Sequence, residues 1–224
     1  MEHETARSDL REEQAPVEGR EMARAGASLD AIASLAGGCR ACQLWSRATQ
    51  TVFGHGPVPA PIMLVGEQPG DREDVVGEPF VGPAGGILDR ALAAAGIDRE
   101  QVFVTNVVKH FKWRPSGKRR LHDRPSRAEV RACHPWIEAE LALVRPQALV
   151  CLGATAAMAL LGAGIRVSEL ARTPVPTPLA PLAMATLHPS AILRAEEGSA
   201  RERAFERLVG DLQLVARQLT ERTS

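Results

Sequence analysis

Two cysteines separated by two residues, Cys39-Arg-Ala-Cys42, are spaced to share a metal ion or cluster. A gap of two residues lets both thiolates face one centre, because the turn brings them onto the same side of the chain. The N-terminus has no apolar core typical of a signal peptide, and four cysteines in such a chain favour metal or redox roles over disulfides. The alternative is two thiols that are merely close in sequence.

A basic stretch, Lys109–Arg131, carries nine Lys or Arg residues and two acids, although the whole chain has a formal net charge of zero. It contains the run Lys118-Arg119-Arg120-Leu121-His122, which follows a Pro-Ser-Gly turn. Positive charge at this density indicates a polyanion nearby, although a solvated loop can have the same composition. Because the net charge is zero, we expect any nucleic-acid contact to be made by one local face.

Polar residues stand at the carboxyl ends of three of the four expected strands, which are 62–67, 102–108, 147–153 and 182–187. They are Glu67 with Gln68, then Asn106, then His188. Ligands of open α/β sheets bind outside the carboxyl ends of the strands, so these side chains are expected to form one site. A Gly-rich segment, residues 81–86, precedes the second helix but lacks the spacings of nucleotide-cofactor motifs.

Helices are expected between these strands, and they define the fold class. They are 28–36, 87–95, 126–143, 154–161 and 199–219. Strands that alternate with helices predict an α/β fold, specifically a three-layer α/β/α sandwich with a central four-stranded parallel sheet. The helix from Ser126 begins with Ser as its cap and Glu129 three residues later, which is the capping-box pattern.

Composition limits the number of domains and the location of the protein. The chain has 224 residues, of which 45% are hydrophobic, which is enough for one substantial core. We expect a single domain at 28–224, preceded by a disordered or loosely helical extension at 1–27. No apolar run reaches the roughly 20 residues of a membrane span, so a cytoplasmic, soluble monomer without membrane contact is expected.

Four motifs, in order, resemble those of the uracil-DNA glycosylase superfamily. They are Gly66-Glu-Gln-Pro-Gly70, Glu78-Pro-Phe-Val-Gly82, Thr105-Asn-Val-Val-Lys109 and His188-Pro-Ser190. The early Cys39-x-x-Cys42 and the later Cys133 are similar to the iron–sulfur enzymes of family 4. The Lys118–His122 run resembles the loop of the UdgX branch, whose members bind uracil-DNA covalently. The resemblance extends from about Cys39 to Arg194 and implies the fold of that superfamily and uracil-containing DNA, preferably single-stranded, as partner.

The resemblance also implies roles for the polar residues. Asn106 would read the O4/N3 edge of an extruded uracil, Phe80 would stack on its face, and His188 would hydrogen-bond O2 and stabilise the leaving anion. Gln68 and Pro69 would shape the same pocket. Each residue also has a purely structural alternative: Asn106 as a strand-end cap, Phe80 as core and His188 as a satisfied loop histidine.

Covalent capture is the specific implication of the UdgX-like loop. After the glycosidic bond breaks, His122 would attack C1′ of the sugar and leave a stable protein–DNA adduct. Glu67 would accept or orient its proton and favour the cationic sugar. Lys118, Arg119 and Arg120 would hold DNA phosphates or keep the loop folded, and Ser190 would also contact the DNA.

A [4Fe–4S] cluster is the implied cofactor, and its fourth ligand is open. Family 4 enzymes have a cysteine where this chain has His110, and imidazole can replace a thiolate on iron. We therefore expect the ligand set Cys39, Cys42, His110 and Cys133. The all-cysteine set with Cys151 is the alternative, although Cys151 lies in an apolar run typical of a packed core residue. Zinc is also compatible with these ligands.

Two other functions fit the same residues. A family 4 glycosylase that turns over would release free abasic DNA and form no adduct. A non-catalytic iron–sulfur module would bind DNA through its basic loop without regard to uracil. Products of the reaction with uracil-DNA distinguish all three.

Overall fold

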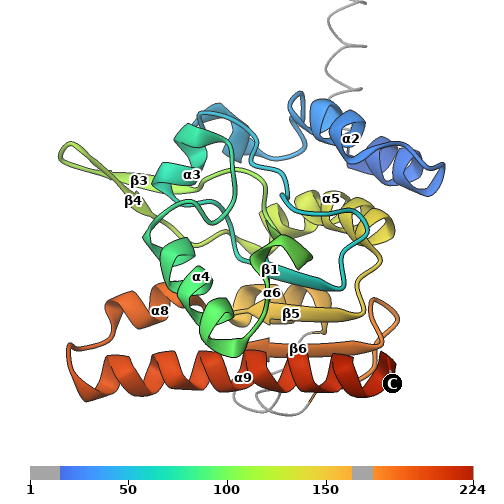
Figure 1. Ribbon diagram of the computed structural model, residues 1–224. Helices are drawn as coiled ribbons and strands as arrows, with labels where there is room; N and C mark the ends of the chain where they lie inside the picture. Colours follow the sequence, from blue (N-terminus) through green and yellow to red (C-terminus); the bar gives the residue numbers. More distant parts are fainter. Residues whose placement is uncertain (1–15, 163–173, 224) are drawn as a thin grey trace, which may run out of the picture.

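The central sheet consists of four parallel strands in the spatial order β2-β1-β5-β6. The computed structural model describes residues 16–162 and 174–223 (Figure 1). The strands are β1 Ile62–Gly66, β2 Val102–Asn106, β5 Ala148–Leu152 and β6 Leu182–Thr186. All their residues are buried, which explains why each strand reads as a continuous apolar run. The predicted four-stranded parallel sheet is confirmed.

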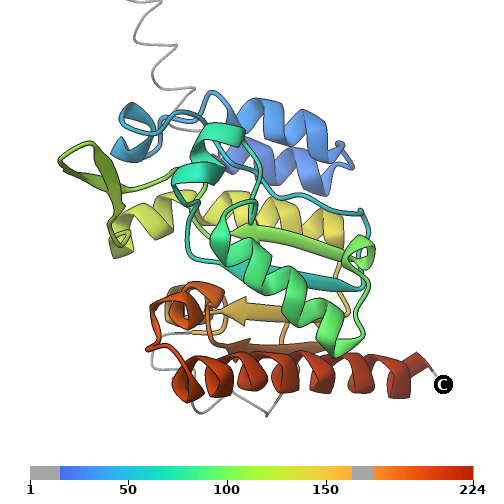
Figure 2. The ribbon, with the colours of Figure 1, turned by 60° about the vertical axis from the view of Figure 1, so that its left-hand side comes forward.

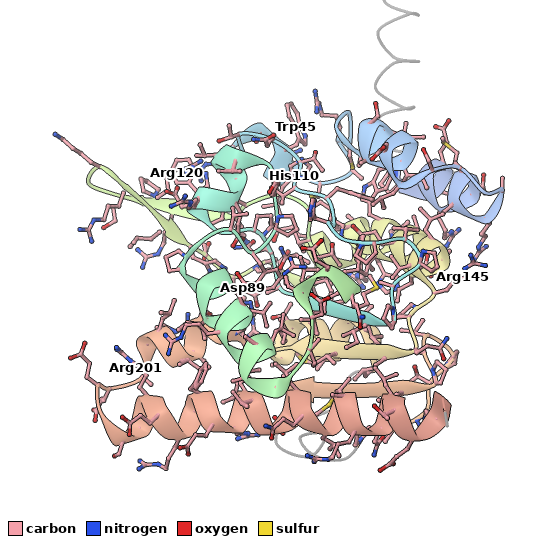
Figure 3. The ribbon with its side chains drawn as sticks, in the orientation of Figure 1. Trp45, Asp89, His110, Arg120, Arg145 and Arg201 are labelled. Carbon is pink, nitrogen blue, oxygen red and sulfur yellow. The ribbon has the colours of Figure 1, made fainter. Side chains whose placement is uncertain are left out.

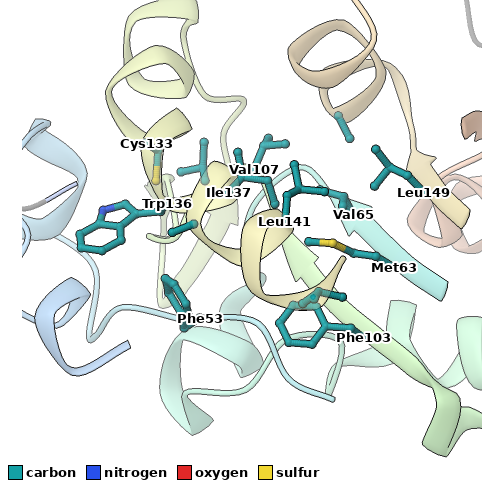
Figure 4. Packing of buried hydrophobic residues seen from close by; sticks show 14 of the residues in the cluster. Phe53, Met63, Val65, Phe103, Val107, Cys133, Trp136, Ile137, Leu141 and Leu149 are labelled. Atoms are coloured by element: carbon teal, nitrogen blue, oxygen red, sulfur yellow. The ribbon is translucent and has the colours of Figure 1, made fainter. Parts of the chain in front are cut away.

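Helices cover both faces of the sheet, which makes the three predicted layers. Successive strand residues point to opposite faces. Met63 and Val65 therefore pack in one cluster with Ile137 (Figure 4). Leu64 packs in the other cluster with Leu88. The first face is covered by α2 Leu29–Ala36, α5 Arg127–Val144 and α6 Ala154–Leu160, and the second by α4 Pro83–Ala95, α8 Pro189–Arg194 and α9 Ser199–Thr223.

The two capped helices begin where the sequence predicts. Ser28 accepts a hydrogen bond of 3.2 Å from the Ala31 amide at the start of α2. At the start of α5, the Ser126 hydroxyl accepts from the Glu129 amide, and the Glu129 carboxylate accepts from the Ser126 amide. Both caps satisfy backbone N–H groups that have no partner within the helix.

A β-hairpin and two short helices were not expected from the sequence. The hairpin consists of β3 Trp113–Ser116 and β4 Arg119–His122, joined through Gly117 at φ 57°. The helices are α3 Asp71–Val76 and α8, and two single 3₁₀ turns, η1 Gln43–Ser46 and η2 Arg99–Gln101, also occur. The hairpin forms within the basic stretch and projects from the body as an arm (Figure 1).

The N-terminal segment is partly described. Residues 1–15 of the predicted extension lie outside the described residues. Residues 16–24 are helical and lie on α5, where Arg20 forms an ion pair of 3.0 Å with Glu138 and Gly19 contacts the ring of Trp136. This part of the extension therefore packs against the domain.

The described helices include none that combines the length and the apolar composition needed to cross a membrane.

Candidate active site

A cavity of about 710 Å³ opens at the carboxyl ends of the strands. Figure 2 shows the strands pointing to the side where α8 and the hairpin also lie. Glu67, Phe80, Asn106, His122 and His188 all line the cavity. Glu67, Gln68, Asn106 and His188, which the sequence places at the carboxyl ends of strands, thus lie together at one edge of the sheet.

Gly66, the last residue of β1, lies where three of these side chains converge. A Cβ atom at this position would contact Asn106 Oδ1, and it would lie 2.9 Å from Phe80 Cζ and 3.4 Å from His188 Nε2. Any side chain here would push these groups apart. Glycine thus allows the amide, the aromatic ring and the imidazole to approach one another at the end of β1.

Asn106 presents an unpaired donor to this pocket. The residue is 2% exposed, and its Nδ2 has no hydrogen-bond partner among the described residues. Its backbone carbonyl, by contrast, accepts a 2.7 Å hydrogen bond from the buried ammonium of Lys109. That ammonium also bonds Glu140 Oε2 at 2.7 Å, so the end of β2 is fixed from beneath. A buried polar group without a partner costs about 1–3 kcal/mol, which a ligand acceptor would recover.

Phe80 is held over the pocket in an unusual backbone conformation. Its φ is 59°, a region that non-glycine residues rarely adopt. Glu73 fixes this loop, because its carboxylate accepts backbone hydrogen bonds from Gly70, Gly82 and Phe80. Burial raises the pKa of Glu73 in spite of these bonds. The Phe80 ring stacks beside His188 with centroids 6.1 Å apart and an interplanar angle of 29°.

The tautomer of His188 follows from its partners. Its Nδ1 lies 3.1 Å from the Ser190 backbone N–H, which can only donate, so Nδ1 is the acceptor. The proton of the neutral ring is then on Nε2, the atom that approaches the Gly66 position. Burial lowers the pKa of His188 to about 4, so the ring is neutral near pH 7. His188 thus offers a neutral N–H donor to the pocket.

Glu67 and His122 face each other across the mouth of the pocket. Glu67 follows β1, and His122 ends β4, with His122 Nε2 3.5 Å from Glu67 Oε1. That distance exceeds an N–H···O hydrogen bond, so no bond to Glu67 holds the ring proton on Nε2, and Nε2 can carry the lone pair. Burial lowers the pKa of His122, although Glu67 acts in the opposite direction. The imidazole is therefore available as a neutral nucleophile.

Two residues that the sequence reading missed complete the Glu67 environment. The Thr155 hydroxyl donates a hydrogen bond to Glu67 Oε2, and Arg124 Nε lies 3.5 Å from the same oxygen. Arg124 also donates to Thr155 Oγ1 through Nε and Nη2, at 3.2 and 3.0 Å. No motif marked Thr155, whereas Arg124 was one of many basic residues in its stretch.

The Gln68 side chain is hydrogen-bonded to the backbone on both sides of the hairpin base, at Lys112 and Asp123. Its Nε2 donates to the carbonyls of Lys112 and Asp123, at 3.1 and 3.0 Å, and its Oε1 accepts from the Lys112 amide at 3.1 Å. Both ends of the amide are thus used, although the residue lines the cavity. Pro69 is buried beside Gln68 and does not line the cavity.

Arg120 anchors the hairpin to α3, which is the second of its two expected roles, keeping the loop folded. Its guanidinium lies 2.6 Å from carboxylate oxygens of both Asp71 and Asp74 (Figure 3). It also lies over the rings of Phe111 and Trp113, at 5.4 and 5.7 Å. With two carboxylates and two rings already engaged, Arg120 is a structural cation.

Lys118 and Arg119 remain candidates for DNA contact. Both are exposed near the tip of the hairpin, and no described residue forms an ion pair with either side chain. Ser190 differs from them, because its hydroxyl lies 2.8 Å from His188 Nδ1 and accepts from Arg194 at 3.1 Å. Ser190 thus orients His188 within the pocket.

Three of the four cysteines lie near one another. The charges of Cys39 and Cys42 both act on Cys133, whose pKa burial raises to about 12. Two of the sulfurs accept hydrogen bonds: Cys39 from Trp136 Nε1 at 3.4 Å, and Cys133 from the Lys109 amide at 3.2 Å. Hydrogen bonds to sulfur are typical of iron–sulfur ligands, so this donor set fits three corners of a cluster.

The fourth ligand is less constrained. His110 is buried, and its Nε2 lies 3.0 Å from Thr51 Oγ1, which leaves Nδ1 as the nitrogen for a metal. Cys151 is fully buried in β5, and burial alone accounts for its raised pKa of about 12. Within residues 16–162 and 174–223, no three His, Cys, Asp or Glu side chains converge on a point that would bind a single metal ion. A four-iron cluster is larger than one ion and needs its ligands further apart.

Comparison with known proteins assigns the family. Residues 53–213 match the uracil DNA glycosylase superfamily, so the chain belongs to this superfamily. A protein of Thermotoga maritima named Type-4 uracil-DNA glycosylase is 35% identical over 169 residues, which cover 75% of this chain and 84% of that protein.

Two archaeal proteins with the same name are also similar. That of Archaeoglobus fulgidus is 43% identical over 130 residues, covering 58% of this chain and 62% of its own length. That of Sulfurisphaera tokodaii is 40% identical over 127 residues, covering 56% and 54%. The matched segment thus spans little more than half the length of these two relatives.

Proposed function

We propose that this protein excises uracil from DNA and that His122 then captures C1′ of the abasic sugar. The first part rests on the buried, unpaired Nδ2 of Asn106 at the end of β2. An amide there donates to O4 of uracil and would meet the N4 amino donor of cytosine unfavourably. Because a pocket of this kind accepts only an extruded base, single-stranded DNA, which requires no unpairing, is the preferred substrate.

Cleavage of the glycosidic bond would be assisted by His188 and Glu67. As the C1′–N1 bond breaks, its electron pair moves to uracil, and the Nε2–H of His188 stabilises the anion at O2. A neutral donor suits this role, because the pKa of His188 is lowered to about 4. The ionised carboxylate of Glu67 stabilises the positive charge that develops on the sugar.

Capture follows from the position of His122 on the hairpin. Its Nε2 faces the pocket at 3.5 Å from Glu67 and holds a lone pair when Nδ1 carries the proton. Attack on C1′ gives an imidazolium beside the Glu67 carboxylate. The imidazolium then loses its Nδ1 proton to solvent. The hydrogen bonds of Gln68 and the ion pairs of Arg120 hold the hairpin where this attack is possible.

We also propose a [4Fe–4S] cluster on Cys39, Cys42, Cys133 and His110. A bound cluster would cross-link the segment before η1 to α5 and to the end of the β2 loop. The reaction requires no electron from it, so its role would be structural.

Release of free abasic DNA without an adduct is the second candidate function. It is favoured by the relatives, which are named Type-4 uracil-DNA glycosylases. In that case Glu67 would orient a water molecule and His122 would be a wall of the pocket.

A denaturing gel with labelled uracil-containing and thymine-containing single strands separates these functions. The proposal predicts a retarded, SDS-resistant band with uracil-DNA alone. A strand cut by alkali, without a retarded band, would instead indicate turnover. Equal binding to both strands with no base release would contradict both candidates.

A further inference from the structure

The two oxygens of Glu67 have unequal surroundings. Oε2 accepts the Thr155 hydroxyl hydrogen and lies 3.5 Å from Arg124 Nε, whereas among the described residues Oε1 has only the His122 ring beside it, with Nε2 at 3.5 Å. A carboxylate oxygen accepts about two hydrogen bonds. Oε2 thus accepts the Thr155 hydrogen and has a cation beside it, whereas no described residue donates a hydrogen bond to Oε1.

The direction of the Thr155 hydrogen is fixed by Arg124. A guanidinium only donates, so the contacts of 3.2 and 3.0 Å from Arg124 to Thr155 Oγ1 make that oxygen an acceptor. The single hydroxyl hydrogen must then point at Glu67. Because Thr155 is 7% exposed at the start of α6, water does not readily replace this bond.

We propose that Thr155, supported by Arg124, is a positioning residue that directs the reaction towards capture by His122 and away from water. This inference rests on the proposed covalent function. A water molecule that attacks C1′ must pass a proton to Glu67, which needs a free lone pair facing that water. Because Oε2 already accepts the Thr155 hydrogen and faces the Arg124 guanidinium, Oε1 is the better acceptor for that water, and the His122 ring lies beside Oε1.

The two routes share their first step and differ in the second. In both, the C1′–N1 bond breaks, and uracil leaves with the electron pair and takes a proton from solvent. In capture, the Nε2 lone pair forms the C1′–N bond and the ring loses its Nδ1 proton. In hydrolysis, water forms the C1′–O bond and Glu67 accepts the proton. No oxidant or further reactant is required.

The experiment compares Thr155→Val with Thr155→Ser in the full-length protein. Valine has nearly the same shape without the hydroxyl, whereas serine keeps it. Protein in excess over a uracil-containing single strand gives one turnover, and a denaturing gel with an alkali-treated parallel sample measures adduct and free abasic DNA. Each is divided by total uracil released, so a change in overall rate does not alter the ratio.

We expect the ratio of free abasic DNA to adduct to rise about tenfold in Thr155→Val, as loss of one charge-assisted hydrogen bond would allow. Thr155→Ser should restore the ratio of the unmodified protein. Arg124→Gln should raise the ratio too, and it decides the outcome if Thr155→Val does not fold, since the Arg124 side chain is 61% exposed and tolerates change.

Two results would overturn the inference. One is adduct as the sole product of the variants; the other is a folded Thr155→Val that releases no uracil, because Thr155 would then act in cleavage itself. Failure of the underlying function looks different: the unmodified protein would form no adduct at all.

Discussion

Single residues in the pocket differ in whether their polar atoms already have partners. The Nδ2 of Asn106 has none among the described residues, whereas His188 Nδ1 and both ends of the Gln68 amide are bonded. The unpaired donor marks where a ligand must supply an acceptor. Paired atoms around it fix the direction in which that donor and the His188 N–H point.

Replacement of Asn106 by Ala tests this distinction between binding and stability. Uracil release should fall by about 10- to 100-fold, since one hydrogen bond to the base is lost. The free energy of unfolding should change by less than about 1 kcal/mol, because the removed NH₂ group is unpaired in the free protein. Single-turnover release and urea denaturation measure the two effects. A variant that unfolds readily but keeps its activity would contradict this assignment.

The acid limit of adduct formation depends on His122. Burial lowers its pKa below the ordinary 6.5, against the opposing charges of Glu67 and Asp123 and together with that of Arg194. A lowered pKa keeps the ring neutral at pH 6.5, and protonation removes the attacking lone pair only at lower pH. Single-turnover rates of adduct formation, measured between pH 4.5 and 8, should therefore fall as the pH is lowered, with a midpoint below pH 6.5. A midpoint at or above 6.5 would contradict the role of neutral His122.

Residue types and motif order predicted several of the side chains that line the pocket, although not Thr155 or Arg124. Asn106, Phe80 and His188 belong to motifs, and the strands that precede or contain Asn106 and His188 end at one edge of the sheet. The partners of these atoms could not be predicted. Nothing in the local sequence around Gln68 indicates that its amide bonds residues 44 and 55 positions away, because those contacts depend on tertiary folding.

At the scale of elements, the basic stretch forms the β3–β4 hairpin, and this hairpin positions His122. Two anchors hold it: Gln68 at its base, and Arg120 on the carboxylates of Asp71 and Asp74 in α3. Neither the hairpin nor α3 was predicted. Both are short and largely polar, so neither shows a periodic pattern of apolar residues. Polar contacts between the two elements stabilise them, rather than burial of apolar side chains.

Arg120 and Arg119 are adjacent in β4, so a matched pair of variants tests whether Arg120 anchors the hairpin while Arg119 contacts DNA. Arg120→Met should loosen the hairpin, so that adduct forms more slowly while uracil is still released. Arg119→Met should leave the fraction captured unchanged, weaken DNA binding and reduce the slope of log affinity against log salt by about one. Single-turnover gels and binding titrations at several salt concentrations measure these effects. Identical behaviour of the two variants would contradict the division of roles.

At the scale of the whole molecule, the pocket and the cysteines lie in different places. The pocket is at the carboxyl ends of the strands, whereas Cys133 lies in α5. Lys109 links them, because its amide donates to Cys133 Sγ while its ammonium holds the carbonyl of Asn106. Four apolar runs between helical segments were sufficient to predict this architecture. The pairing of Cys39 with Cys42 was predicted from spacing and the addition of Cys133 from the family resemblance, whereas the buried Lys109–Glu140 pair had no signal in the sequence.

Iron content distinguishes the cysteines. Cys133→Ser should lose most bound iron, whereas Cys151→Ala should keep it, because Cys151 packs in the core as an apolar side chain. His110→Ala tests the fourth ligand and should also lower the iron content. Chemical iron analysis and the absorbance of the purified proteins give the readout. Retention of iron by Cys133→Ser, or its loss from Cys151→Ala, would contradict the proposed ligand set.

The most direct test of the central claim is a comparison of the unmodified protein with His122→Ala on one denaturing gel. Both are incubated with a labelled single strand that contains one uracil, and half of each sample is treated with alkali. The unmodified protein should give an SDS-resistant adduct, whereas His122→Ala should give no adduct and should leave free abasic DNA that alkali cuts. An adduct that persists in His122→Ala would show that His122 is not the nucleophile.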